Sequence, residues 1–153
     1  MVSTDTTAPV WAADLVLPSP LANTSTSGCE AADFAGMPAG AIVLLQRGTC
    51  AFLLKWQNAQ AAGAGGIVQI NEGDSPAPTD PLWFDLAGSG ILVPMVAAQI
   101  STVEQLAGSV RQGLVGKTAR LRIDWRPGNY PTQNVIAQTG SGDPLVGNPL
   151  LLS

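Results

Sequence analysis

The sequence predicts a single α/β domain, and three observations support this prediction. Residues 41–46 (AIVLLQ) form a continuous apolar run, as expected for a strand that is buried on both faces. An alanine-rich segment with helical spacing separates this run from a second one at residues 65–70 (GGIVQI). Strand, helix and strand follow one another within about 30 residues, which is typical of a right-handed βαβ crossover between parallel strands.

The helix of this unit is expected from about residue 50 to residue 62, with Thr49 as its N-cap. One stripe of the helix is formed by residues that recur at i, i+4, i+7 and i+11, namely Phe52, Trp56, Ala59 and Gly63. The second half of the segment is rich in alanine and glycine. Such small side chains allow the helix to pack closely on a sheet.

The same periodicities predict the remaining elements. Further strands are expected at residues 9–17, 94–100, 118–126 and 132–139. The segment 118–126 (TARLRIDWR) alternates between apolar and polar residues, which predicts one buried and one solvated face. A second helix is expected to begin at Ser101, with Glu104 completing a capping box, and to end at Gly113.

Composition excludes several classes of function. Hydrophobic residues make up 46% of the 153-residue chain and charged residues 12%, which indicates a compact globular domain. The formal net charge of −4 and seven scattered basic residues argue against nucleic acid as a partner, because phosphate binding depends on clustered Lys and Arg. No membrane span is expected, since no apolar stretch reaches the roughly 18–20 residues that a span needs.

The absence of histidine restricts the chemistry further. Without imidazole, neither a Ser-His-Asp nor a Cys-His catalytic arrangement can form, and zinc sites with histidine ligands are excluded. Serine–lysine catalysis would need Lys55 or Lys117, and neither lies in a recognisable motif. The sequence therefore predicts no catalytic residue, no metal ligand and no cofactor in this chain.

The two cysteines, Cys29 and Cys50, leave three interpretations open. As a disulfide, the pair would close a loop of about 22 residues, stabilise the fold by roughly 3 kcal/mol and indicate an oxidising compartment. As a catalytic thiol, Cys50 would have its pKa lowered by the amides at the helix start, but the usual base, histidine, is missing. The third interpretation is a pair of unbonded, inert thiols. The disulfide is the favoured interpretation.

Residues 28–113 carry a series of motifs that resembles the protease-associated (PA) domain. The series comprises Gly28-Cys29, residues 40–52 (GAIVLLQRGTCAF), Lys55, residues 58–64 (NAQAAGA), residues 66–68, Asn71, residues 93–96 (VPMV) and the segment that begins at Ser101. Its fairly specific core is the arginine-glycine-x-cysteine-x-phenylalanine sequence from Arg47 to Phe52.

The resemblance implies an α/β domain with a swivelling β/β/α fold, in which an open barrel-like pair of sheets is flanked by two helices on one side. It also implies that Cys29 pairs with Cys50. PA domains belong to secreted and vacuolar proteases, aminopeptidases and sorting receptors, where they are non-catalytic and are thought to bind peptides or cover an active site. The expected location is therefore extracytoplasmic: secreted, cell-surface or lumenal. Asn23 heads an N-glycosylation triplet, and its modification is left open.

The flanking segments 118–126, 132–137 and 142–144 resemble the exit from a PA insert into a secreted dizinc aminopeptidase. That family then carries a His-x-Asp metal motif, which residues 145–153 lack. We therefore expect a PA domain over residues 1–139, a truncated tail over residues 140–153, and zinc only in a catalytic domain outside this chain. The alternative is an autonomous peptide-binding module of a sorting receptor or of a subtilisin-like protease.

Two regions are candidates for contact with peptides or proteins. For peptide binding the candidates are Arg47, Gly48, Thr49, Phe52 and Asn71. Amides at a helix N-terminus attract carboxylates, and the guanidinium of Arg47 offers a fork that suits a peptide carboxylate. Alternatively, Arg47 is solvated or paired with a neighbouring acid.

The second region is the long connection over residues 71–93, because loops of this length are usually functional or mobile. Its adjacent aromatic residues Trp83 and Phe84 either contact a partner, such as the parent peptidase domain, or pack beneath the loop. The acidic residues of this connection are Glu72, Asp74, Asp80 and Asp85. Their spacing matches no known calcium loop, and they are interpreted as solvated.

Overall fold

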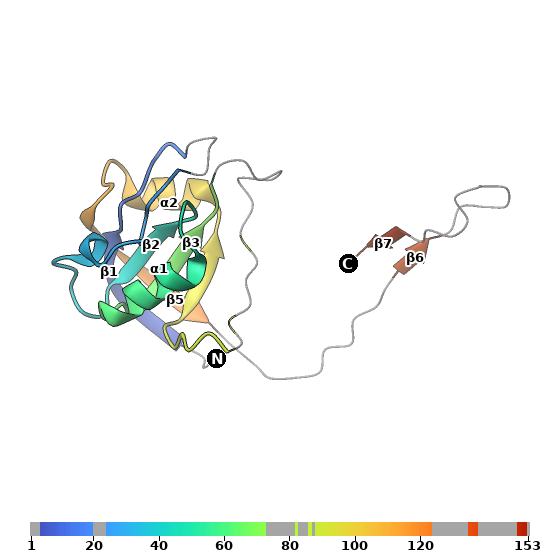
Figure 1. Cartoon of the computed structure of the whole chain (residues 1–153), viewed down its shortest axis with the longest axis horizontal. Coiled ribbons are helices and arrows are strands. Elements are labelled where there is room, and N and C mark those ends of the chain that lie inside the picture. The colour runs from blue at the N-terminus through green and yellow to red at the C-terminus, as the bar shows by residue number, and fades with distance from the viewer. Residues whose placement is uncertain are drawn as a thin grey trace.

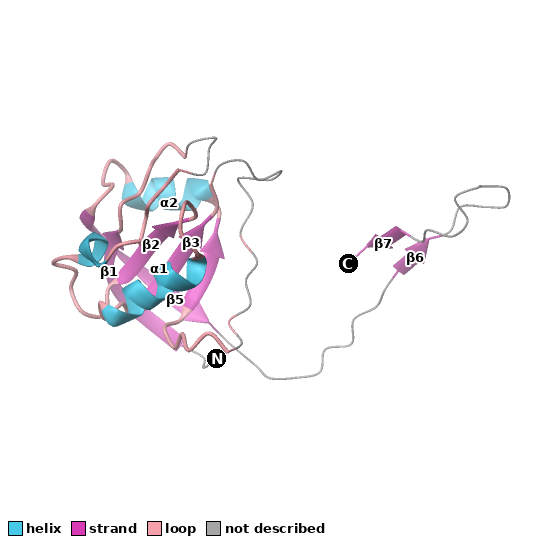
Figure 2. Ribbon diagram, in the orientation of Figure 1, coloured by secondary structure: helices cyan, strands magenta, loops and turns pink. Residues whose placement is uncertain are grey.

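A five-stranded mixed sheet forms the centre of the computed structural model (Figures 1 and 2). The structure describes residues 4–19, 24–72, 82, 86, 88–123, 135–137 and 150–152. In chain order the elements of the central domain are β1 (Thr4–Ala12), a 3-10 helix (Ala31–Phe34), β2 (Ile42–Gln46), α1 (Phe52–Ala61), β3 (Gly66–Ile70), β4 (Met95–Ala98), α2 (Ile100–Ala107) and β5 (Gly113–Ile123). Strands β6 (Val135–Ala137) and β7 (Leu150–Leu152) form a separate antiparallel pair.

The strand order of the sheet is β4-β3-β2-β1-β5. The first four strands are parallel, and β5 runs antiparallel to β1. Every residue of β2 and of β3 is buried, as their continuous apolar sequences predict. The predicted βαβ unit is therefore confirmed, with α1 connecting the adjacent strands β2 and β3.

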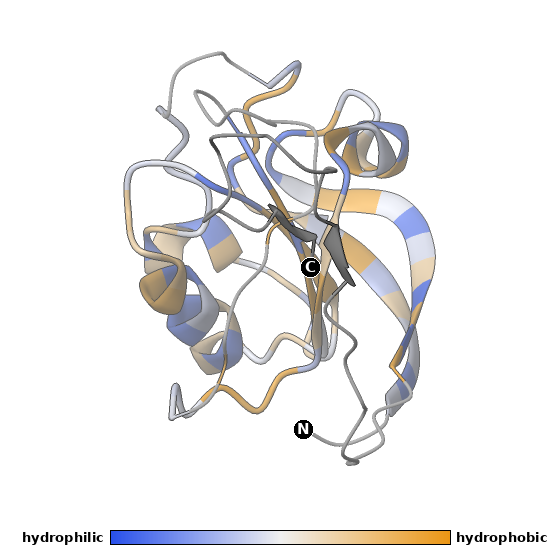
Figure 3. Cartoon of the chain, turned by 90° about the vertical axis from the view of Figure 1, so that its right-hand side faces the viewer, coloured by the Kyte–Doolittle hydropathy of each residue, from blue (hydrophilic) through white to orange (hydrophobic). Residues whose placement is uncertain are grey.

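Each face of the sheet is covered by one helix (Figure 3). Ile42 and Leu44 of β2 belong to one core cluster together with Val103 of α2. Val43 of the same strand belongs to the opposite cluster together with Trp56 of α1. The expectation of two helices on one side is therefore wrong. The physical reason is that strands with apolar side chains on both faces need cover on both sides.

Strand β5 makes the sheet curl. Adjacent strands lie about 4.8 Å apart, and β5 is three positions away from β3 in the sheet. Even so, a Cβ atom on Gly66 of β3 would lie 2.7 Å from Leu121 Cδ2 of β5. The end of β5 therefore folds over the α2 side of the sheet, and Leu121 is buried there while Arg120 and Arg122 are exposed. The predicted α/β class with two flanking helices is confirmed, and within the described residues of the central domain the sheet is a single one that curls.

Two strands begin earlier than the apolar pattern predicts. β1 covers residues 4–12 instead of 9–17, and β5 begins at Gly113 instead of residue 118. The first residues of β1 are polar, so periodicity does not identify them. They are ordered by pairing with β5, where Arg120 forms two hydrogen bonds to the carboxylate of Asp5, of 2.7 and 2.6 Å.

Both predicted helix caps are wrong. The N-cap of α1 is Ala51, and no side chain caps this end. The N-cap of α2 is Gln99, so Ser101 lies inside the helix and the capping box with Glu104 does not form. This helix ends at Ala107, before Gly108 with its φ of 57°, and not at Gly113. Neither helix is long and apolar enough to cross a membrane, as judged over the described part of the chain.

We predict that truncating the core between the two helices destabilises the fold. Leu44 is fully buried, and Leu44→Ala is expected to lower the free energy of unfolding by about 2–5 kcal/mol because it leaves a cavity. Leu92 is 89% exposed, and Leu92→Ala should change this free energy by less than about 0.5 kcal/mol. Urea denaturation of both variants measures the difference, and equal losses would contradict the assignment of the core.

Candidate functional site

Three segments converge where the parallel strands β2 and β3 end. They are residues 24–29, the turn 47–50 after β2, and residues 71–72 after β3. We call this arrangement the strand-end site. In open α/β sheets, ligands bind outside the carboxyl ends of the parallel strands, so the position is suited to binding.

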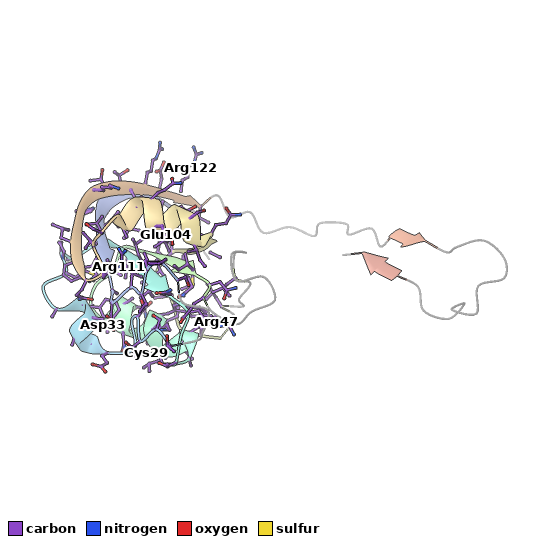
Figure 4. All side chains as sticks on the ribbon, turned by 90° about the horizontal axis from the view of Figure 1, so that it is seen from above. Cys29, Asp33, Arg47, Glu104, Arg111 and Arg122 are labelled. Carbon is purple, nitrogen blue, oxygen red and sulfur yellow. A yellow bond between two sulfur atoms is a disulfide. The ribbon has the colours of Figure 1, made fainter. Side chains whose placement is uncertain are left out.

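Arg47 lies at this site and is held by β3. Its backbone N–H donates to Ile70 O at 2.9 Å, and its Nη1 donates to Asn71 Oδ1 at 3.2 Å. The side-chain oxygen of Asn71 also accepts from the backbone N–H of Glu72. Arg47 is half-buried and, among the described residues, forms no salt bridge. Within the described part of the chain, its side chain is therefore positioned by an amide and not by an acid. Figure 4 shows Arg122 on the opposite side of the domain.

The turn after Arg47 packs against the backbone of residues 24–29. A Cβ atom on Gly48 would lie 1.8 Å from Ser25 O, so a side chain at this position would force the two segments apart. Thr49 N donates to the same carbonyl at 2.9 Å, and Thr49 Oγ1 does so at 3.4 Å. The hydroxyl that was expected to cap α1 therefore serves this contact instead.

Glu72 fixes the beginning of the same segment. It is fully buried, and its Oε1 accepts hydrogen bonds from the backbone N–H groups of Thr24 at 2.8 Å and Ser25 at 3.0 Å. The interpretation of Glu72 as a solvated acid is therefore wrong. The other acidic residues of the connection, Asp74, Asp80 and Asp85, lie outside the described residues, as do the candidate partner contacts Trp83 and Phe84.

Lys55 of α1 fixes the end of the segment 24–29 from the helix side. It is fully buried, its Nζ donates a hydrogen bond to Ser27 O, and the same nitrogen lies 3.5 Å from Cys29 Sγ. Asn58, one turn further along the helix, donates to the carbonyls of Gly28 at 3.1 Å and Cys29 at 3.0 Å. Because the lysine contacts a carbonyl and not a serine hydroxyl, the contact does not create a serine–lysine nucleophile.

The disulfide Cys29–Cys50 is present and joins this segment to the turn before α1, with a Cα–Cα distance of 6.0 Å. Phe52, the first residue of α1, stacks on Trp56 with ring centroids 5.7 Å apart. The structure therefore brings Arg47, Gly48, Thr49 and Asn71 together. Phe52 begins the helix that follows this turn.

Sequence reasoning missed the structural roles of Lys55 and Glu72. For Lys55 a signal was present, because it follows Phe52 by three residues and precedes Ala59 by four. This spacing places it beside the buried stripe of α1. For Glu72 no comparable signal exists in the sequence, since its partners are backbone amides more than 45 residues away.

Comparison with known proteins identifies the family of this chain. Residues 11–106 match the model of the PA domain family. The match covers more than half of the chain and runs from the end of β1 into α2. The chain therefore belongs to the PA domain family.

Relatives of this chain include peptidases. It is 56% identical over 71 residues to an aminopeptidase of Pseudomonas aeruginosa (strain UCBPP-PA14), covering 46% of this chain and 13% of that protein. It is 34% identical to a probable leucine aminopeptidase 2 of Aspergillus fumigatus, covering 93% of this chain and 28% of that protein. A zinc aminopeptidase from Bacillus subtilis superposes with a TM-score of 0.49 at 26% identity, over 75% of this chain and 24% of that one. The chain thus spans less than a third of the length of each.

We predict that Lys55 makes the stability of the domain depend on pH. Burial lowers the pKa of Lys55 from 10.5 to about 8, and the negative charges of Glu72, Asp33 and Asp14 oppose this shift. Between these two values the unfolded chain binds more protons than the folded one, so the free energy of unfolding rises with pH. The gain from this group should be roughly 2 kcal/mol between pH 7 and pH 10.

The measurement is chemical denaturation of the wild type and of Lys55→Met at both pH values. Groups other than Lys55 contribute to both proteins and cancel in the comparison. Wild-type stability should therefore rise relative to that of Lys55→Met as the pH increases. A difference that stays constant would show that Lys55 is not desolvated in the folded protein.

Proposed function

We propose that this chain is the PA domain of an exported aminopeptidase and that its strand-end site binds peptide or protein chains through a carboxylate. The observation that supports this most directly is the geometry of Arg47. Asn71 is the only hydrogen-bond partner of its guanidinium among the described residues, which leaves further N–H donors for a ligand. Arginine presents these donors as a planar fork that matches a carboxylate.

The start of α1, which follows Arg47 by a few residues in the chain, exposes apolar side chains that suit a peptide. Phe52 is half-buried, and the following residues Leu53 and Leu54 are 41% and 42% exposed. A peptide with its carboxylate on Arg47 would reach these side chains at the start of α1. The charge on Arg47 would select the carboxylate, and the apolar residues would add contact area with little sequence preference.

The parent protein is proposed to carry its zinc in a separate catalytic domain. The present chain has no histidine, and its described residues contain no group of three or more His, Cys, Asp or Glu able to hold a metal ion. These residues do not fit a zinc site, so we assign no catalytic step to them. The proposed role of the domain is to bind substrate chains, or to control their access, for the parent peptidase domain.

The proposed location is outside the cytoplasm. A disulfide links the two cysteines of the chain, and structural disulfides persist mainly in oxidising compartments. The disulfide holds the turn that carries Arg47, so the proposed binding site itself would depend on such a compartment.

We expect no peptidase activity from this chain by itself. Purified protein should not hydrolyse an aminoacyl anilide, with or without added zinc, because the chain lacks the residues of a metallopeptidase centre. The full-length parent serves as the positive control. Turnover that co-purifies with the isolated chain would refute the assignment of a purely binding role.

We predict that peptide binding depends on Arg47 and on a free carboxylate. An NMR titration of the ¹⁵N-labelled chain should show saturable shifts at residues 47–52 and 71–72 with peptides that end in a carboxylate. The same peptides as C-terminal amides should bind at least about tenfold more weakly, because charge-assisted hydrogen bonds are lost. Arg47→Ala should cause a similar loss.

Arg122→Ala is the matched control, because it removes an exposed arginine on the opposite side of the domain and should leave binding unchanged. Equal affinity of carboxylate and amide peptides would contradict the role of Arg47. An absence of shifts at millimolar peptide would reject peptide binding and would favour a domain that only covers the active site of its parent.

A further inference from the structure

The two sulfur atoms of the disulfide lie in different electrostatic environments. Cys29 Sγ is 3.5 Å from Nζ of the fully buried Lys55, and Thr49 Oγ1 lies 3.9 Å from the same sulfur. Within the described residues, Cys50 Sγ has no interaction other than the disulfide bond itself. Among the residues that the structure describes, a cationic donor therefore contacts Cys29 Sγ and not Cys50 Sγ.

The start of α1 also favours negative charge, but to a smaller extent. Cys50 precedes the N-cap residue Ala51, so it lies just outside the helix. A helix end carries about half an elementary charge, spread over several N–H groups. The ammonium of Lys55 is a full charge in a buried position at contact distance from Cys29 Sγ. The ammonium therefore stabilises a thiolate on Cys29 more than the helix end stabilises one on Cys50.

We propose that the disulfide is a polarised site for thiol–disulfide exchange, in which an external thiol attacks Cys50 and the Lys55 ammonium stabilises Cys29 as the leaving thiolate. The substrates of this site would be small thiols or the dithiol groups of redox proteins. Both cysteines are half-buried, so the site is partly accessible from solvent. The proposal does not depend on peptide binding at Arg47.

The exchange balances as follows. A thiolate RS⁻ forms a bond to Cys50 Sγ, the Cys29–Cys50 bond breaks, and its electron pair leaves on Cys29 Sγ. The products are a mixed disulfide between R and Cys50 and the Cys29 thiolate beside Lys55. A second RS⁻ then attacks the mixed disulfide, which releases RSSR and the Cys50 thiolate. The protein is reduced by two electrons, and two thiols are oxidised. A leaving thiol with a lower pKa departs faster, which directs the first attack to Cys50.

The first test uses the wild-type chain and glutathione as the thiol. After brief exposure, the reaction is quenched with acid, free thiols are alkylated and the protein is digested with trypsin. Cleavage after Arg47 and Lys55 separates Cys29, in peptide 1–47, from Cys50, in peptide 48–55. We expect glutathione on Cys50 and the alkyl group on Cys29 in at least about fivefold excess over the reverse. An even distribution, or an excess of glutathione on Cys29, would overturn the proposal.

The second test asks whether Lys55 causes the preference for attack on Cys50. Lys55→Met should abolish the preference and slow reduction by roughly tenfold. The matched control is Lys117→Met, since Lys117 contacts Gln105 O on another part of the domain and should leave both quantities unchanged. Retention of the full bias in Lys55→Met would refute the role of the lysine. The wild-type distribution decides the direction of attack even if this variant does not fold.

A third measurement addresses the thiolate directly. The rate of alkylation against pH gives the pKa of Cys29 in Cys50→Ser and of Cys50 in Cys29→Ser. The pKa of Cys29 should lie at least about one unit below that of Cys50, and adding Lys55→Met to Cys50→Ser should remove this difference. A Cys29 pKa equal to or above that of Cys50 would overturn the proposal.

Discussion

The strand-end site depends on one interaction, the hydrogen bond from the buried ammonium of Lys55 to the carbonyl of Ser27. This ammonium lies on the inner side of α1 and donates to the carbonyl of Ser27, which fixes residues 24–29 against the helix. Ser25 O in this segment then accepts hydrogen bonds from Thr49, which holds the turn after β2 in place. A series of contacts thus runs from the interior of the domain to the surface where Arg47 lies. Without the lysine, a buried carbonyl would lose its donor, at a cost of about 1–3 kcal/mol.

The charge of Lys55 is better explained by its positioning of residues 24–29 than by a contribution to stability. Burying the ammonium is unfavourable, as its pKa of about 8 indicates. An apolar side chain of similar volume would remove that cost but could not hold the carbonyl of Ser27. Glu72 acts in the same way from the other side, since its carboxylate accepts from two backbone amides. Two buried charges therefore define where an irregular segment lies, which apolar packing alone would leave poorly specified.

The sequence predicts those parts of the structure that depend on local pattern. The βαβ unit follows from the apolar runs of β2 and β3 and from the stripe of Trp56 and Ala59 on α1. The roles of Lys55 and Glu72 are not predictable in this way, because their partners are 28 and 47 residues away and belong to no regular element. The same reason explains the wrong cap at Thr49. A capping rule assumes a free hydroxyl, and tertiary structure assigns this one to Ser25 O.

The candidate site residues follow mainly from the resemblance to the PA domain and less from a physical pattern in the sequence. For one of them, Gly48, the structure explains why this residue type is needed. Gly48 is required because the carbonyl of Ser25 occupies the space of a side chain. The same segment is bound to Cys50 through the disulfide at Cys29. The peptide site proposed at Arg47 and the exchange site proposed at Cys50 are therefore both held in place by residues 24–29. Any effect of the disulfide state on ligand affinity must then be matched by an equal effect of the ligand on the disulfide equilibrium, because linkage between two sites is reciprocal.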